Sequence, residues 1–192
     1  MKIIIGLGNP TDRYHYTRHN LGQLALEEFH SKQAHNFSNF SANKKVDALI
    51  ASGNINSEQI ILAKPLTFMN ESGLTAKKII SFYKAKPTDL WVIHDELDLP
   101  LGKIKISSNV SAAGHKGVAS IINSLQTKNF VRFRLGIGKN PTADPNWVIQ
   151  KFTTEEIPLL NKVLQLTNEA ILTALTKGIQ SAQTIFNQKN SL

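Results

Sequence analysis

A chain of 192 residues is long enough for one domain that buries roughly 70% of the surface its unfolded form exposes. The absence of cysteine excludes disulfides, thiolate catalysis and thiolate metal ligands, and it is typical of a reducing compartment. Lysine and arginine number 22 against 14 for aspartate and glutamate, and this net charge of +8 indicates a polyanionic partner.

The chain begins with a predicted strand and helix. Residues 2–7 are nearly all aliphatic, which is typical of a strand buried on both faces in a parallel or mixed sheet. Residues 20–33 place apolar side chains at helical spacing. Residues 35–45 are polar and predict a surface loop. The stretches 46–51 and 59–63 then predict a hairpin with a long turn.

Strands and helices alternate through the rest of the chain. We expect helices over residues 74–83, 115–125 and 154–186, the last broken near Gly178, and strands over residues 90–94, 103–107 and 130–137. This alternation predicts an α/β fold: a single domain over residues 1–187 whose mixed, mostly parallel twisted sheet carries helices on both faces. Residues 188–192 are expected to form a frayed C-terminal tail. No apolar run approaches the ~20 residues of a membrane span, and no signal peptide is recognisable, so we expect a soluble protein.

Two glycines follow the first strand and suggest a dinucleotide-binding loop at Gly6 and Gly8. That interpretation fails because Thr11 occupies the place of the third glycine and Pro10 removes a backbone donor. The glycines are better explained as a turn that presents Asn9 at the carboxyl end of a strand, where open α/β sheets bind ligands.

The same region contains two histidines four residues apart. His15 and His19 have a metal-ligand spacing, but further ligands would have to come from elsewhere, and we expect no metal site. His19 as a general base needs a partner that orients its ring. Asp95 is the candidate because it directly follows the carboxyl end of the predicted strand 90–94. The alternative is that Asp95 belongs to a solvated turn.

Other candidates also have structural interpretations. Asn70 precedes a helix and has the preference of an N-cap residue. His115 starts another helix and is either a capping histidine or a packed one. Phe68 and Met69 are most simply explained as core residues.

Basic side chains lie on alternate positions of two predicted strands. Arg132 and Arg134 share one face of their strand, and Lys103 and Lys105 share a face of another. Together they predict either a stripe that binds phosphates or a charged sheet face.

Six ordered segments make the chain resemble the bacterial-type peptidyl-tRNA hydrolase family along essentially its whole length. They are IxGLGNP at 4–10, YxxTRHNxG at 14–22, KPxTFMNxSG at 64–73, HDELDLPxG at 94–102, GHxG at 114–117 and RxRxGIG at 132–138. Six motifs in this order form a highly specific match.

This resemblance implies an enzyme that hydrolyses the ester between a peptide and tRNA without a cofactor. His19 is implied as the general base that activates water, and Asp95 as the group that keeps it basic. Asn9 would lie beside the blocked amino end of the substrate and distinguish peptidyl-tRNA from aminoacyl-tRNA. The residues implied to bind substrate or tRNA are Tyr14, Phe68, Met69, Asn70, His115, Lys116, Lys105 and Arg134. The partner would be peptidyl-tRNA, held at its 3′ end and acceptor-stem phosphates by a cytoplasmic monomer.

The chain departs from the family pattern at two positions. Lys116 replaces the asparagine that most members carry after the histidine of GHxG, and lysine has no acceptor atom. Ser107 stands where a further phosphate-binding lysine is expected.

The sequence leaves two alternative functions open. Lys116 slightly favours an RNA-binding homologue with reduced or lost catalysis, whereas the presence of both His19 and Asp95 argues against it. A small-molecule esterase or peptidase is disfavoured by the basic composition.

Overall fold

The computed structural model describes residues 1–140 and 143–188, and within them the chain forms one seven-stranded sheet. The strands are β1 (Lys2–Gly6), β2 (Ser41–Asn43), β3 (Ala48–Ile55), β4 (Glu58–Pro65), β5 (Leu90–Glu96), β6 (Ile104–Ser108) and β7 (Val131–Gly136). Their order is β2-β3-β4-β1-β5-β7-β6.

The four central strands β4, β1, β5 and β7 run parallel. Strands β3 and β6 run antiparallel to their neighbours, and β2 is antiparallel to β3. Five of the seven strands therefore point the same way, which confirms the predicted mixed, mostly parallel sheet. As a result, the carboxyl ends of the central strands meet at one edge.

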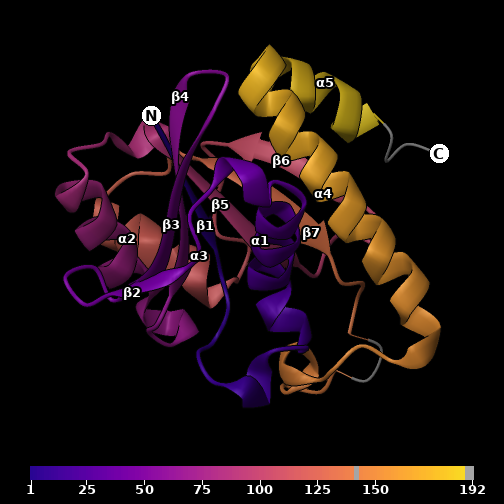
Figure 1. Cartoon of the computed structure of the whole chain (residues 1–192). Helices are drawn as coiled ribbons and strands as arrows, with labels where there is room; N and C mark the ends of the chain where they lie inside the picture. Colours follow the sequence, from indigo (N-terminus) through magenta and orange to yellow (C-terminus); the bar gives the residue numbers. More distant parts are fainter. Residues whose placement is uncertain (141–142, 189–192) are drawn as a thin grey trace.

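Helices cover both faces of the sheet, as predicted (Figure 1). Helices α1 (Leu21–Lys32), α4 (Ile157–Lys177) and α5 (Ile179–Gln188) pack on one face, and α2 (Ser72–Phe82) and α3 (Lys116–Leu125) on the other. Because strand side chains alternate between faces, Ile4 joins the first core while Ile3 and Ile5 join the second. This double burial explains the continuous aliphatic run of β1.

Close backbone approach, rather than turning, explains the glycines near β1. A Cβ on Gly22 would lie 2.3 Å from the carbonyl oxygen of Ile93, so this residue lets the start of α1 touch the sheet. Neither Gly6 nor Gly8 has a positive φ. A Cβ on Gly8 would lie 2.8 Å from the Gln23 side chain. The expectation that these glycines exist to turn the chain was wrong, although they do bring Asn9 to the sheet edge.

Three local features differ from the sequence prediction. The predicted loop 35–45 contains β2, a short edge strand that pairs with β3. The hairpin between β3 and β4 turns through only two residues, Asn56 and Ser57, both with positive φ, so the predicted long turn was wrong. The break at Gly178 is confirmed, because this residue has a φ of 87° between α4 and α5.

The last described residue, Gln188, still belongs to α5, and the remainder of the predicted tail lies outside the described residues. Within residues 1–140 and 143–188, none of the helices combines the length and apolarity that crossing a bilayer requires.

Candidate active site

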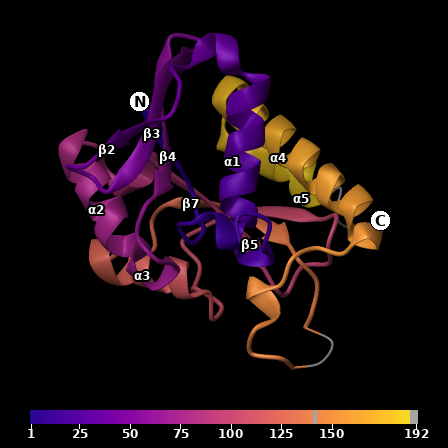
Figure 2. The same cartoon turned by 60° about the horizontal axis from the view of Figure 1, so that its bottom comes forward.

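A cavity of about 640 Å³ opens at the edge where the central strands end. Figure 2 brings this edge forward and shows α3 and the segment before α4 on opposite sides of β5. The described residues lining the cavity are Asn9, His19, Met69, Asn70, Asp95, Glu96, Leu97, Ala113, Gly114, His115, Lys116, Pro145, Asn146, Val148 and Ile149. Seven of the eleven site residues predicted from sequence thus lie around one cavity.

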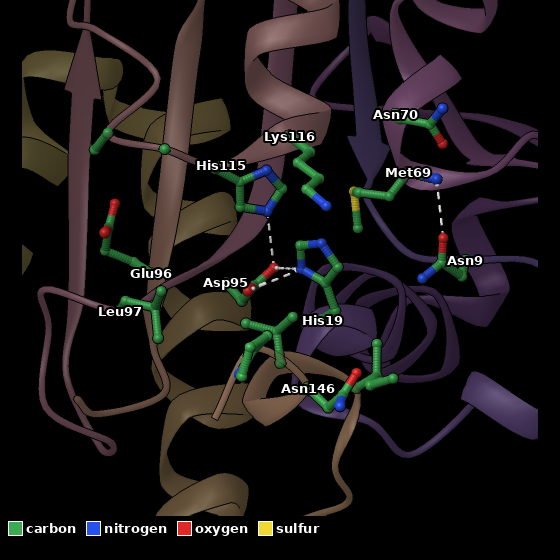
Figure 3. Close-up of a pocket in the computed structure, with 15 residues that line it drawn as sticks. Asn9, His19, Met69, Asn70, Asp95, Glu96, Leu97, His115, Lys116 and Asn146 are labelled. Carbon is green, nitrogen blue, oxygen red and sulfur yellow. Dashed lines mark hydrogen bonds and ion pairs between the residues drawn. The ribbon is translucent and has the colours of Figure 1, made fainter. Parts of the chain in front are cut away.

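His19 and Asp95 form the floor of this cavity (Figure 3). His19 belongs to a 3-10 turn just before α1 and is 8% exposed. Its Nδ1 donates to both carboxylate oxygens of Asp95, at 2.9 and 3.0 Å. Because a carboxylate only accepts, the ring proton is assigned to Nδ1, and Nε2 keeps its lone pair. The predicted contact is confirmed, and Asp95 is buried rather than part of a solvated turn.

Asp95 is held in its ionised form by its two histidine partners. Burial acts to raise the pKa of Asp95, but the charges and hydrogen bonds of His19 and His115 outweigh it and hold that pKa well below its usual range. The floor of the cleft therefore carries a fixed negative charge under His19.

His115 acts both as a helix cap and as a partner of Asp95. Its Nδ1 accepts the backbone N–H of Val118 at 3.2 Å, which confirms the capping interpretation. Its Nε2 donates to Asp95 Oδ1 at 2.8 Å. The backbone bond fixes the tautomer, because Nδ1 as an acceptor leaves the proton on Nε2. Asp95 consequently receives an N–H group from each of two histidines.

His94 supports the site from behind and was not predicted to matter. Its Nδ1 donates to the carbonyl oxygen of Asp95 at 2.7 Å, and its ring lies edge-on to that of His115, with centroids 4.7 Å apart. Burial, followed by the charges of His115 and Arg132, keeps the pKa of His94 well below its usual value. This ring is therefore a neutral packing element.

Asn9 is fixed by bonds to two other segments. Its backbone N–H donates to the Asn20 side-chain oxygen at 2.9 Å, and the Asn20 amide returns a bond to the Asn9 carbonyl. The N–H of Met69 donates to Asn9 Oδ1 at 2.9 Å. Since the oxygen is occupied, the Asn9 amide nitrogen is the group left to donate into the cavity.

The rim of the cavity carries exposed polar groups. Asn70 lines the cavity and does not cap α2, because Glu71 holds the N-cap position and makes no side-chain cap bond. The capping interpretation of Asn70 was therefore wrong. Met69 is buried, as a core interpretation expects, yet also lines the cavity. Phe68 is 50% exposed and is not a core residue. Neither Phe68 nor Tyr14 lines the cavity.

The basic residues of β6 and β7 lie outside the cavity lining. Lys105 and Arg134 are paired across the two strands, so their predicted proximity is confirmed. The Nε of Arg134 donates to the buried Glu96 at 2.9 Å. Arg132 is only 2% exposed, and burial, with the nearby charge of Arg134, lowers its pKa to about 10. The predicted stripe therefore does not include Arg132.

A clamp around Arg18 holds one wall of the cavity, and sequence reasoning missed it. Arg18 is 1% exposed and donates two hydrogen bonds to Glu156, at 2.9 and 2.7 Å. Its guanidinium also lies 3.9 Å from the ring centroid of Trp147. Trp147 belongs to the wall segment that contributes Val148 and Ile149, so Arg18 ties this wall to the turn that carries His19.

Three potential metal ligands meet at the floor. Atoms of His19, Asp95 and His115 lie within 4.8 Å of one another. They are, however, already bonded as two N–H donors and their acceptor, so a metal would have to displace both protons. His15 is not among them, since it contacts Glu27 at 3.1 Å.

Comparisons with known proteins agree with the geometry. The family described as peptidyl-tRNA hydrolase matches residues 3–192. Peptidyl-tRNA hydrolases of Thermodesulfovibrio yellowstonii and Carboxydothermus hydrogenoformans are both 40% identical to the chain, of which they cover 98%, with 100% and 99% of their own lengths. A crystal structure of peptidyl-tRNA hydrolase from Acinetobacter baumannii superposes with a TM-score of 0.89 at 28% identity, covering 100% of this chain and 95% of the other. The chain belongs to the peptidyl-tRNA hydrolase family.

Proposed function

We propose that the cleft hydrolyses the ester that joins a peptide to the 3′ ribose of tRNA, with His19 as general base. One observation carries this mechanism: the His19 ring is bonded through Nδ1 to a buried carboxylate and leaves Nε2 as an acceptor. The membership of the chain in the peptidyl-tRNA hydrolase family supplies the substrate and the reaction.

The reaction needs a base and hydrogen-bond donors only. His19 Nε2 takes a proton from water, whose oxygen attacks the ester carbonyl carbon and leaves negative charge on the carbonyl oxygen. As this intermediate collapses, the ribose oxygen departs and takes the proton back from His19, while Asp95 stabilises the transient imidazolium. A positioned base of this kind contributes on the order of 10²–10⁴ in rate. No serine or threonine hydroxyl lines the described part of the cavity, which supports water as the nucleophile.

Asn9 supplies a means of selecting N-blocked substrates. Its oxygen is bonded to Met69 N–H, so its amide nitrogen donates toward the substrate. A peptide offers that donor a carbonyl oxygen next to the blocked nitrogen. A free aminoacyl group offers an ammonium, which has donors only. The site therefore favours peptidyl-tRNA over aminoacyl-tRNA.

The tRNA is held outside the catalytic floor. In this proposal the 3′ end binds the exposed Phe68 and Asn70 together with Tyr14, beside the cavity that Met69, His115 and Lys116 line. Lys105 and Arg134 form a basic pair for acceptor-stem phosphate, in line with the net charge of +8. The enzyme acts as a cytoplasmic monomer without metal, cofactor or membrane contact. The alternative, an RNA-binding homologue without catalysis, gains no support from a site whose base and carboxylate are both in place.

A single-turnover assay on N-acetyl-aminoacyl-tRNA and free aminoacyl-tRNA tests this function. The wild type should hydrolyse the blocked substrate selectively. His19→Ala should lower its rate on the order of 10²–10⁴-fold, with affinity for deacylated tRNA retained because the basic pair is untouched. Wild-type-like turnover by His19→Ala would rule out the mechanism, and equal rates on both substrates would rule out the selectivity.

A further inference from the structure

Lys116 is the one cation among the described residues that line the cavity, apart from its histidines. It is the first residue of α3, and its side chain descends from the helix so that the amine points toward the His19 ring (Figure 3). The side chain is exposed within the cleft. This direction sets Lys116 apart from the phosphate-binding candidates Lys105 and Arg134, which lie outside the cavity lining.

The acids near Lys116 are committed to other partners. Asp95 accepts hydrogen bonds from His19 and His115, and Glu96 holds Arg134. Within the described part of the chain, the Lys116 side chain makes neither a hydrogen bond nor an ion pair. Its charge is therefore available to a ligand.

The surroundings of Lys116 add to its positive charge. The first turn of α3 contains no acidic residue, although helix N-termini favour negative groups. A lysine in this position opposes the helix dipole, so it costs the helix some stability. The helix N-terminus and the Lys116 amine therefore carry charge of the same sign on this side of the cleft.

The direction of the amine decides which negative charge it meets. In the proposed reaction, the water activated by His19 attacks the carbonyl carbon of the ester. The oxyanion forms on the carbonyl oxygen of that same carbon, and therefore close to His19 Nε2. The phosphates of the tRNA are separated from that carbon by the terminal ribose. A cation directed at the His19 ring is placed for the oxyanion rather than for a phosphate.

We propose that Lys116 is a catalytic residue that donates a charge-assisted hydrogen bond to the oxyanion of the ester intermediate. The inference rests on the proposed hydrolase function. It adds to the general base His19 a hydrogen-bond donor for the oxyanion, which the base itself cannot supply. Removing one donor of an oxyanion site typically costs about 10²–10³ in kcat. The Asn9 amide remains for the blocked end of the substrate, so the two donors have separate tasks.

The test compares Lys116→Met with Lys105→Met, a matched change at a lysine outside the cavity lining. Hydrolysis of N-acetyl-aminoacyl-tRNA gives kcat and KM, and competition by deacylated tRNA over a series of salt concentrations gives its Ki and salt slope. We expect Lys116→Met to lower kcat about 10²–10³-fold, with the Ki for deacylated tRNA and its slope close to wild type. Lys105→Met should raise Ki and reduce the log–log slope by about 0.9, because it loses a duplex phosphate contact.

The size of the kcat effect decides the outcome. A decrease of less than tenfold for Lys116→Met overturns the proposal, and a weaker Ki with a smaller salt slope would then assign Lys116 to phosphate binding. Lys116→Asn, which restores a neutral donor, should recover part of the lost kcat. An inactive wild type would contradict the hydrolase function itself, whereas an active wild type with an equally active Lys116→Met contradicts only this inference.

Discussion

The floor and the rim of the cleft are built in opposite ways. On the floor, His19, Asp95 and His115 are largely shielded from solvent, and both histidines are bonded to Asp95. The backbone N–H of Val118 fixes the tautomer of His115, and the Asp95 carboxylate fixes that of His19. On the rim, Asn70 and Lys116 are exposed, and their side chains bond to no described residue. The difference separates two tasks. In the proposed hydrolysis, the floor groups bring a fixed geometry to the chemical step, whereas the rim groups, Lys116 included, obtain their partners from the substrate.

The largest effect should follow from breaking the floor with Asp95→Asn. Both histidines contact Asp95 Oδ1, and His19 alone also contacts Oδ2. Asparagine replaces one of these two acceptor oxygens by an NH2 group, which only donates. His115 cannot change tautomer, because Val118 N–H occupies its Nδ1. The amide oxygen is therefore expected at the Oδ1 position and the amide nitrogen at the Oδ2 position, where its N–H opposes the Nδ1–H of His19. This contact between two donors would favour the tautomer of His19 with its proton on Nε2.

We expect this variant to lose kcat on the order of 10²–10⁴-fold. Steady-state hydrolysis of N-acetyl-aminoacyl-tRNA measures it, with affinity for deacylated tRNA as the control for an intact surface. A kcat near the wild-type value would show that His19 does not need its hydrogen bond to Asp95 to act as the general base.

A smaller effect should come from the wall that Arg18 holds. Glu156→Gln removes the charge from a two-bond contact to a buried guanidinium, and it should lower the free energy of unfolding by about 1.5–3 kcal/mol. KM should rise more than kcat falls, because the wall segment loses its anchor. Glu155→Gln is the matched control, since the carboxylate that hydrogen-bonds Arg18 is that of Glu156. Equal behaviour of the two variants would contradict the role of the clamp.

The neutral ring behind the floor predicts a pH dependence of stability. The pKa of His94 is lowered in the folded protein, so below about pH 6.5 the unfolded chain binds a proton that the folded protein does not. The free energy of unfolding should therefore decrease as the pH is lowered below about 6.5, and His94 should contribute at most about 1.4 kcal/mol of this decrease per pH unit. Chemical denaturation between pH 6.5 and 4.5 should show a shallower slope for His94→Gln. The same slope in both proteins would show that His94 is not kept neutral by folding.

The floor could be predicted from sequence because its residues follow the ends of neighbouring parallel strands. Asp95 is the next-to-last residue of β5 and Asn9 follows β1, and such strand ends converge at one edge. The Arg18–Glu156 contact had no such signal. Its partners are 138 residues apart, and the sequence around Glu156 indicates only an acidic residue in the first turn of a helix.

The remaining errors have similar causes. The two-residue repeat of a strand places Arg132 and Arg134 on one face of β7. This repeat does not reveal which part of the face is covered by other segments, so the burial of Arg132 was not predicted. Strand β2 has only three residues in a polar segment, and its pairing with β3 rather than any apolar pattern defines it.

The most direct test of the central claim is the protonation state of the His19 ring nitrogens. Histidine-selective ¹⁵N NMR at pH 8, with the His19 signals assigned by their loss in His19→Ala, reports it without turnover. We predict a proton on Nδ1 and an unprotonated Nε2 in the wild type, and the reverse in Asp95→Asn. A wild-type His19 with its proton on Nε2 would contradict the claim that Asp95 presents this histidine to the cleft as a base.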